Sequence, residues 1–415
     1  MGAASVGARL APSARTRVEL LLRAYRLANA PITRRAIRAR LDPYVEGPKA
    51  GAVRQYQIGW ARYGSFLADP RVNRSIVLKA PRPSGEKGVL LLMFEYNWLR
   101  VLSDPAVARY LDEAFQVVFQ TSWSPTDYAL LALALNTLPG TIFVQACNYG
   151  EIPALEQFSP RVKCLPTIAC DWINPSFYRP RPSAERSIDI LMVANWAPFK
   201  RHWQFLETLS RMPRNLRVTL VGQPEAGRTR DEILAEAALY GVKQQLAFVD
   251  SVSISEVTRL QCDSRVSLIF SRREGCCVAA VESLFADSPL GMLRDAHVGP
   301  IAYINEQTGV LLDPSGGLDR QLMRFLEISP SLRPRDWAVS HIAFSRSHER
   351  VNRMFRDHAK RHGLPWTADL KAYCLRPYAA FVSASDREEM RPVYEDLHRR
   401  FPHTFSPHLI QDSKL

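Results

Sequence analysis

Residues 271–282 read Ser-Arg-Arg-Glu-Gly-Cys-Cys-Val-Ala-Ala-Val-Glu, and this stretch carries most of the information about the fold. The preceding residues, 266–270, are Val-Ser-Leu-Ile-Phe, a composition typical of a buried strand. From residue 278 the apolar residues follow helical spacing. The sequence therefore predicts a strand, a short loop that contains Glu274, and a helix that contains Glu282.

The start of this predicted helix is a candidate binding site for an anion. The first N–H groups of a helix have no partner within the helix, and the helix dipole adds partial positive charge. Glu274 and Glu282 are eight residues apart, one before the helix and one inside it. We expect them to hold hydroxyl groups on either side of a bound phosphate, as the binding of a sugar nucleotide requires.

The same residues resemble a known motif. Glu274-Gly275 followed by Glu282 is similar to the E-x7-E element of retaining glycosyltransferases of the GT-B fold, especially family 4. Ser271 before the element, Pro289 after the helix and Thr-Gly-Val-Leu-Leu at residues 308–312 extend the similarity. The alternative is an ordinary loop glutamate and a solvated helix glutamate.

The resemblance, which covers mainly residues 188–313, implies a role for each residue. Glu282 would hold the ribose hydroxyls, and Glu274 would contact the transferred sugar. The N–H groups of small residues at the helix start would face the distal phosphate. The implied nucleotide-binding positions are Ser271, Gly275, Cys276, Cys277 and Val278. A redox role for the two cysteines is an alternative, but packing is the favoured interpretation.

A second loop, residues 194–202, reads Ala-Asn-Trp-Ala-Pro-Phe-Lys-Arg-His and follows another predicted strand. Lys200 fits the lysine that family 4 enzymes place on the diphosphate. Asn195 or Trp196 stands where their arginine is usual, and Asn195 is a further expected nucleotide-binding residue. The second cation is therefore open, and Arg201 is favoured. Two cations there would balance the charge of a departing diphosphate. Alternatively, they lie on a solvated helix start.

Other motifs add little. Gly222 ends a predicted strand and resembles a family turn near the nucleotide, and Asp250 stands where that family often has glycine. The sequence lacks the glycine-rich nucleotide motifs and the G-x-S-x-G element. It also lacks Asp-x-Asp, the usual metal–diphosphate ligand of the other major glycosyltransferase fold. We therefore expect no cofactor and no metal.

Composition sets the broad class. A chain of 415 residues with 47% hydrophobic residues predicts two globular domains. No apolar run approaches the ~20 residues that span a bilayer, and the first 30 residues lack the apolar core of a secretory signal. The seven cysteines lack metal-type spacing, so a reducing cytoplasm is expected. They are residues 147, 164, 170, 262, 276, 277 and 374.

Strands alternate with helices in two series, which predicts an α/β chain with two doubly wound Rossmann-like domains facing across a cleft. The bounds are 61–180 for an acceptor domain and 188–335 for a nucleotide-sugar donor domain. Residues 175–187 are proline-rich and predict the linker. A basic helical extension, 1–60, precedes these domains, and a helical tail, 336–415, is expected to pack back on the first.

The formal net charge of +13 favours acidic partners. Residues 9–40 hold nine arginines and one acid, and residues 18–27 have helical apolar spacing. A basic amphipathic helix is typical of a peripheral membrane element, here at the inner face of the membrane. The alternative is a helix packed on the domain with solvated arginines. No nucleic-acid motif is found, so no nucleic acid is expected as a partner.

The first domain gives weaker signals. No histidine precedes His202, although many family members carry one near the reacting centre. Polar residues follow three predicted strands and are candidates for acceptor binding or for solvated loops: Glu95, Tyr96, Asn97, Thr121, Ser122, Trp123, Asn148, Tyr149, Gly150 and Glu151.

Together the residues and the resemblance predict a retaining, metal-independent glycosyltransferase that moves a sugar from a nucleotide-sugar donor to a glycan or lipid-linked acceptor. Lys200, Arg201 and Glu274 are the expected catalytic residues. The rivals are a catalytically degenerate GT-B protein, a sugar-nucleotide epimerase and, with least support, a basic nucleic-acid-binding protein.

Overall fold

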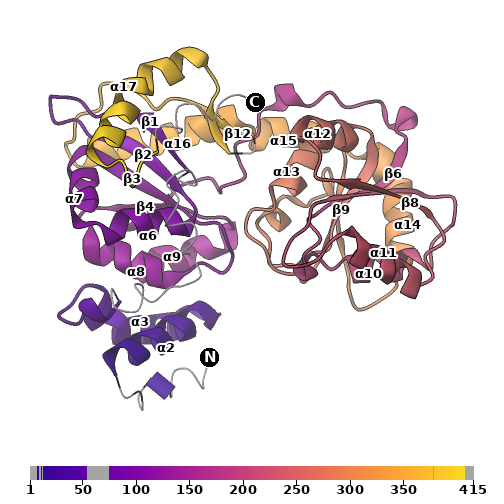
Figure 1. The fold of residues 1–415 in the computed structure, drawn as a ribbon, viewed down its shortest axis with the longest axis horizontal. Helices are drawn as coiled ribbons and strands as arrows, with labels where there is room; N and C mark the ends of the chain where they lie inside the picture. Colours follow the sequence, from indigo (N-terminus) through magenta and orange to yellow (C-terminus); the bar gives the residue numbers. More distant parts are fainter. Residues whose placement is uncertain (1–6, 9–10, 12, 54–73, 377, 407–415) are drawn as a thin grey trace. The chain divides into compact units, whose positions relative to one another are not determined.

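The computed structural model describes residues 7–8, 11, 13–53, 74–376 and 378–406 of the chain. They form two compact units (Figure 1). Unit 1 contains the described residues up to Ala169 and from His348 onward, and unit 2 contains residues 170–347. Each unit has a mainly parallel sheet covered by helices, so the predicted α/β class with two Rossmann-like domains is confirmed.

The sheet of unit 1 has five strands in sequential order, with β1 antiparallel to β2 and the others parallel. Every residue of β2 is buried, as expected for a strand covered on both faces. The strands are β1 (Ser75–Lys79), β2 (Gly88–Met93), β3 (Phe115–Gln120), β4 (Ile142–Gln145) and β5 (Val162–Cys164).

The two faces of this sheet are covered by different parts of the chain. On one face, Trp98 of α6 packs on Phe119 at 5.1 Å between ring centroids, and on the other Phe355 of α16 packs on Phe143 at 4.7 Å. The C-terminal helices thus cover the face of the sheet that crossover helices cover in a doubly wound fold (Figure 1). The helices are α6 (Glu95–Ser103), α7 (Pro105–Ala114), α8 (Tyr128–Thr137), α9 (Ile152–Phe158), α16 (Phe344–Arg361) and α17 (Ala384–Arg400).

The N-terminal helices α2 (Ala14–Leu27) and α3 (Pro31–Val45) belong to unit 1 instead of forming a separate extension. The apolar side of α2 is buried, with Tyr25 donating from its hydroxyl to the Ala154 carbonyl at 2.8 Å. The sequence left two alternatives open for this helix, an apolar side that faces a membrane and one that packs on the domain, and this packing favours the second. Residues 54–60 of the predicted extension lie outside the described residues.

The C-terminal segment contacts a buried ion pair near the first two strands of unit 1. Lys79 pairs with Glu86, and both side chains are almost fully buried. Glu86 also accepts from the N–H of Thr367 at 2.8 Å, and Lys79 lies 3.4 Å from the ring centroid of Trp366. A short hairpin, β12 (Tyr373–Leu375) and β13 (Ala379–Phe381), precedes α17.

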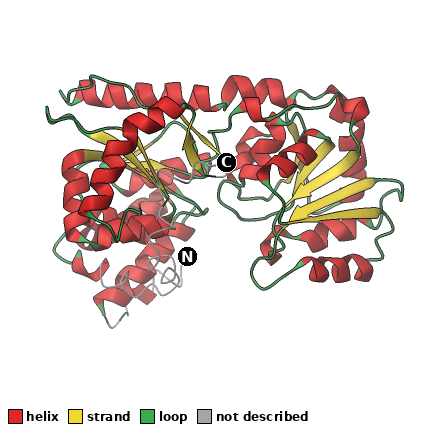
Figure 2. Ribbon diagram, turned by 45° about the horizontal axis from the view of Figure 1, so that its top comes forward, coloured by secondary structure: helices red, strands yellow, loops and turns green. Residues whose placement is uncertain are grey.

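The sheet of unit 2 has six parallel strands in the order β11-β10-β9-β6-β7-β8. Helices lie on both of its faces (Figure 2). The strands are β6 (Ile188–Val193), β7 (Arg217–Gly222), β8 (Gln245–Asp250), β9 (Ser264–Ile269), β10 (Leu290–Leu293) and β11 (Gly309–Leu312). The helices are α10 (His202–Leu209), α11 (Arg230–Leu239), α12 (Ile254–Cys262), α13 (Val278–Phe285), α14 (Leu318–Ile328) and α15 (Pro334–His341).

Residues 175–187, which the sequence suggested as a linker, lie within unit 2. Arg335 donates to the Pro175 carbonyl at 3.1 Å, and the Tyr178 ring packs 6.1 Å from that of Phe285. The boundary therefore falls earlier, after Ala169. None of the helices in the described parts of the chain combines the length and hydrophobicity that crossing a bilayer requires.

Candidate functional site

The strand order of unit 2 reverses between β6 and β9. The chain runs from β6 outward through β7 and β8, and then returns to the other side of β6 to form β9. Ligands of open parallel sheets bind at such a reversal, outside the carboxyl ends of the strands. The loops at this position are residues 194–201 after β6 and 270–277 after β9. They are the two loops that the sequence singled out.

The loop after β6 is fixed by its neighbours. Trp196 is fully buried and donates from Nε1 to Asp250 at 2.9 Å, and its backbone N–H donates to the Gln223 carbonyl at 3.0 Å. Asn195 uses its side-chain oxygen locally, accepting from the Ala197 N–H at 3.4 Å. Asp250, which the family pattern marks as unusual, therefore anchors this loop.

Gly222 has a packing role. A Cβ atom at this position would lie 2.6 Å from the Ala194 carbonyl oxygen and 2.7 Å from Cζ2 of Trp196. Both neighbours are rigid, so only glycine fits. The loop after β6 thus fills the space beside its Cα. The contact of Gly222 with a ligand stays a prediction.

Lys200 and Glu274 meet at this reversal. Nζ of Lys200 lies 2.7 Å from Oε2 of Glu274, and both side chains are about 10% exposed. The other carboxylate oxygen, Oε1, is buried and has no hydrogen-bond partner among the described residues. The carboxylate thus has one oxygen bound to the ammonium group and one available for a ligand hydroxyl.

Arg201, the favoured second cation, is placed differently. It adopts a left-handed backbone conformation, with φ of 56°, and its guanidinium lies 3.4 Å from the Gln204 side-chain oxygen. Arg228, in the loop after β7, pairs with the Glu236 carboxylate. Burial, and then the positive charges of Arg228 and Lys200, lower the pKa of His202 to about 3. His202 is therefore neutral at physiological pH, and sequence reasoning had not singled out Arg228.

The amino end of α13 is open. Cys277 occupies the N-cap position with φ of 42°, and no side chain caps the helix. Residues 276–279 are partly exposed, whereas Ala280 and Val281 are buried. Glu282 is partly exposed one turn into the helix, on the same face as Val278. The amino end of α13 thus has no side-chain cap, and the Glu282 carboxylate lies on the same helix.

The remaining predicted residues of this loop are buried or partly buried. The Ser271 hydroxyl is buried without a hydrogen-bond partner among the described residues, and Gly275 is buried and accepts from the Gly299 N–H at 3.1 Å. Burial, reinforced by the charge of Glu274, raises the pKa of Cys277 far above its usual value. The thiol of Cys277 therefore stays protonated, which favours packing over the redox alternative.

The polar residues of unit 1 hold a loop in place. Glu95 is buried and accepts from both the N–H and the hydroxyl of Ser122, and burial raises the pKa of its carboxyl group. Glu151 accepts from the N–H of Thr126 at 3.0 Å and from its hydroxyl at 2.6 Å. These contacts fix the loop that carries Trp123, which is 39% exposed.

Other predicted polar residues of unit 1 are also engaged locally. Asn97 donates to the Met93 carbonyl at 2.7 Å, and Asn148 accepts from the Gly150 N–H at 2.9 Å. The Cys147 N–H donates to the hydroxyl of Thr121 at 2.9 Å. Within the described ranges, no group of three or more His, Cys, Asp or Glu side chains is arranged to hold a metal ion.

No protein-family model matches this chain, and no curated protein sequence matches it. Solved structures do. Sucrose-phosphate synthase from Thermosynechococcus elongatus shares 13% identity over 76% of this chain and 80% of its own, with a TM-score of 0.51. HepE from Anabaena, solved in complex with UDP, shares 12% identity over 66% of this chain and 78% of its own, with a TM-score of 0.50.

A third similar structure is TarM from S. aureus, with 12% identity over 59% of this chain and a TM-score of 0.47. The match spans 51% of the TarM chain, about half of its length. At these identities the likenesses show the fold alone. The likenesses to sucrose-phosphate synthase and HepE, together with the two units described above, establish that the chain has the GT-B fold, with Rossmann-like α/β units.

Proposed function

We propose that this protein is a glycosyltransferase that binds a nucleotide-sugar donor at the carboxyl edge of the unit 2 sheet. One observation carries the proposal: the Lys200–Glu274 ion pair lies at the reversal between β6 and β9, beside the uncapped amino end of α13. A cation, a carboxylate and free helix N–H groups are the set that a diphosphate joined to a sugar requires.

The diphosphate and Glu274 compete for Lys200. An arriving phosphate replaces the carboxylate as the partner of the ammonium group, and the carboxylate then accepts from a sugar hydroxyl. Charged hydrogen bonds of this kind contribute about 1.5–3 kcal/mol each. We propose Arg228 as the second cation in preference to Arg201. Its charge acts on His202 together with that of Lys200, and a phosphate would replace its present partner, the Glu236 carboxylate. The Arg201 guanidinium instead contacts Gln204.

The resemblance of residues 271–282 to family 4 supports the finer steps. Glu282 holds the ribose. The bond between the anomeric carbon and the phosphate oxygen breaks, and the acceptor oxygen bonds to the same face of that carbon, so configuration is retained. The acceptor proton moves to the departing phosphate. The charge of the leaving group is stabilised by Lys200, Arg228 and the α13 N–H groups without a metal.

The acceptor is proposed to be a glycan or a lipid-linked glycan used at the inner membrane surface. The arginine-rich segment of residues 9–40 supports that setting.

The test is release of nucleoside diphosphate from a panel of UDP-, GDP- and ADP-sugars, with and without glycan acceptors. The Lys200→Met variant is expected to abolish release, and Lys243→Met, at an exposed lysine of the same unit, is expected to leave it unchanged. The anomeric proton of the product reports retention, and activity with a chelator reports metal independence. Nucleotide binding without transfer would favour a degenerate protein, and sugar interconversion without release would favour an epimerase.

A further inference from the structure

The turn between α2 and α3 exposes two large apolar side chains. Leu27, the last residue of α2, is 51% exposed, and Ile32, at the start of α3, is 71% exposed. The turn between them is ordered: the Ala28 N–H donates to the Tyr25 carbonyl at 3.2 Å, and Arg34 donates to the Ala28 carbonyl at 2.8 Å. A fixed apolar tip of this kind has no partner within the described part of unit 1.

Two exposed arginines lie directly behind the tip. Arg23 precedes Leu27 by one helical turn, and Arg35 follows Ile32 by three residues, so each arginine shares a helix face with one apolar residue. Neither guanidinium forms an ion pair among the described residues. The residue order is therefore apolar at the tip and cationic one turn behind it, on both helices.

The remaining charge of this helix pair is mostly positive. Residues 14–45 contain eight arginines and two acids, Glu19 and Asp42. Arg38 is paired with Asp42. The Arg26 guanidinium donates to the Pro125 carbonyl at 2.7 Å and forms no ion pair among the described residues. The field around the tip is therefore strongly positive.

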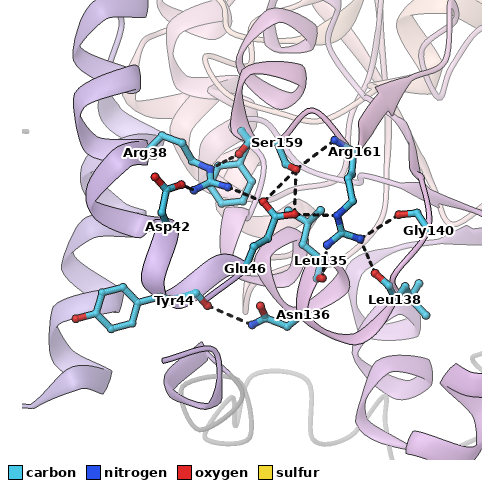
Figure 3. A network of polar contacts seen from close by, with 11 residues as sticks. Arg38, Asp42, Tyr44, Glu46, Leu135, Asn136, Leu138, Gly140, Ser159 and Arg161 are labelled. Carbon is cyan, nitrogen blue, oxygen red and sulfur yellow. Dashed lines mark hydrogen bonds and ion pairs between the residues drawn. The ribbon is translucent and has the colours of Figure 1, made fainter. Parts of the chain in front are cut away.

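The helix pair is held rigidly against unit 1. Figure 3 shows Arg38 and Arg161 on either side of Glu46, at 3.0 Å and 2.8 Å from its two carboxylate oxygens. Arg161 also donates to the carbonyls of Leu138 and Gly140 at 2.6 Å and 3.0 Å. Arg38 and Glu46 thus anchor α3 on unit 1. The tip lies at the other end of α3 and takes no part in this anchoring.

We propose that this α2–α3 tip, formed by Leu27 and Ile32 with Arg23 and Arg35, docks on an anionic lipid bilayer. Apolar side chains at a tip enter the boundary between headgroups and acyl chains, and arginines one turn back remain at the level of the lipid phosphates. A nucleic acid would match the charge but not the two exposed apolar residues. Only Leu27, at the end of the amphipathic stretch that the sequence suggested, belongs to this surface, since most of the apolar side of α2 is buried.

This inference deepens the proposed work at a membrane surface, and its measurement does not involve the donor site. The full-length protein is sedimented with vesicles of phosphatidylcholine alone and of phosphatidylcholine with phosphatidylglycerol. We expect binding to the anionic vesicles only, weakened by added salt. Removing both apolar residues, in Leu27→Ser with Ile32→Ser, is expected to reduce the partition coefficient at least tenfold.

Two matched controls keep the test specific. Leu239→Ser removes a leucine of unit 2 that is 80% exposed and is expected to leave vesicle binding unchanged. Arg23→Gln with Arg35→Gln is expected to reduce binding roughly thirtyfold at low salt, whereas Arg214→Gln with Arg324→Gln, at exposed arginines of unit 2, changes it little. All four targets of the tip variants are exposed, so unchanged thermal unfolding is expected to verify the fold.

Three results would overturn the inference: no binding to anionic vesicles, equal loss in the tip and control variants, or tight binding to duplex DNA that competes with vesicles. Nucleotide binding by the wild-type protein is measured in parallel. If the wild-type protein binds a nucleotide but not anionic vesicles, the docking inference falls and the donor site stands. If it binds anionic vesicles but no nucleotide, only the proposed function falls.

Discussion

Removing one partner of the Lys200–Glu274 pair should expose how this site is built. The two side chains are about 10% exposed and their charged atoms are 2.7 Å apart. Glu274→Gln preserves the shape of the side chain but leaves the ammonium group buried without its counter-charge. Breaking a buried pair in this way costs about 3 kcal/mol. For a unit of the size of residues 170–347, this loss lowers Tm by roughly 6–12 °C.

A double-mutant cycle separates the pair from the single effects. Lys200→Met with Glu274→Gln removes both charges, and we expect a coupling free energy of about 2 kcal/mol in thermal or urea unfolding. The exposed Glu207–Arg211 pair, with an N–O distance of 3.2 Å, is the control and should give less than about 0.5 kcal/mol.

The same cycle with saturating nucleoside diphosphate tests the partner exchange. If phosphate replaces Glu274 on Lys200, the coupling between the two residues falls toward zero in the presence of the nucleotide. A coupling in the ligand-free protein that equals the control, or one that the nucleotide leaves unchanged, would refute the reasoning.

Three further outcomes follow from the geometry. Gly222→Ala places a Cβ against Trp196 and should destabilise unit 2 by about 1–3 kcal/mol in urea unfolding and weaken nucleotide binding, whereas Gly316→Ala, which meets no atom within 4 Å, should do neither. The pKa of His202 is about 3 in the folded state and 6.5 in the unfolded state, so only the unfolded chain binds this proton as the pH falls below 6.5. The free energy of unfolding should therefore be lower by about 1.4 kcal/mol at pH 5.5 than at high pH. Denaturation of His202→Gln should show a shallower loss with pH, and an unchanged slope would contradict the buried neutral imidazole. In calorimetric titration, Arg228→Gln should weaken nucleoside diphosphate binding about tenfold or more and Arg201→Gln should weaken it less, and the reverse order would restore Arg201 as the second cation.

Much of unit 2 could be predicted from its sequence. Each of the strands β6 to β9 is a run of apolar residues followed by helical spacing, and that alternation depends on local patterns alone. Strand β10 was missed because Leu290–Leu293 is a short run that contains a glycine and follows Pro289. Its place in the sheet is set by pairing with β9 and β11, which no local pattern reports.

The site was predictable where a motif sets it and not where tertiary contacts do. Lys200 and Glu274 were both named from their loops, and the structure brings them together. Arg228 comes from a third loop with no motif, and its approach to His202 depends on how β7 lies beside β6. The adjacent Arg201 looked equivalent to Lys200 in sequence, but it has a left-handed backbone and its guanidinium contacts Gln204.

The N-terminal helix shows the same limit. Its apolar spacing fits a membrane surface and a packed domain equally, and the sequence left both open. Burial of Tyr25 against Tyr128 and Phe158, with ring centroids at 4.7 Å and 5.1 Å, decides for packing. These partners lie more than 100 residues away in the chain, beyond the reach of any periodicity.

The measurement that tests the central claim most directly is calorimetric titration of the protein with UDP, GDP and ADP. The donor-site account predicts micromolar binding of one of them. It also predicts a loss of about 2 kcal/mol in Glu282→Ala, as for a charged hydrogen bond, with no loss in Glu306→Ala at an exposed loop glutamate. Failure of all three nucleotides to bind, or equal affinity in wild type and Glu282→Ala, would contradict it.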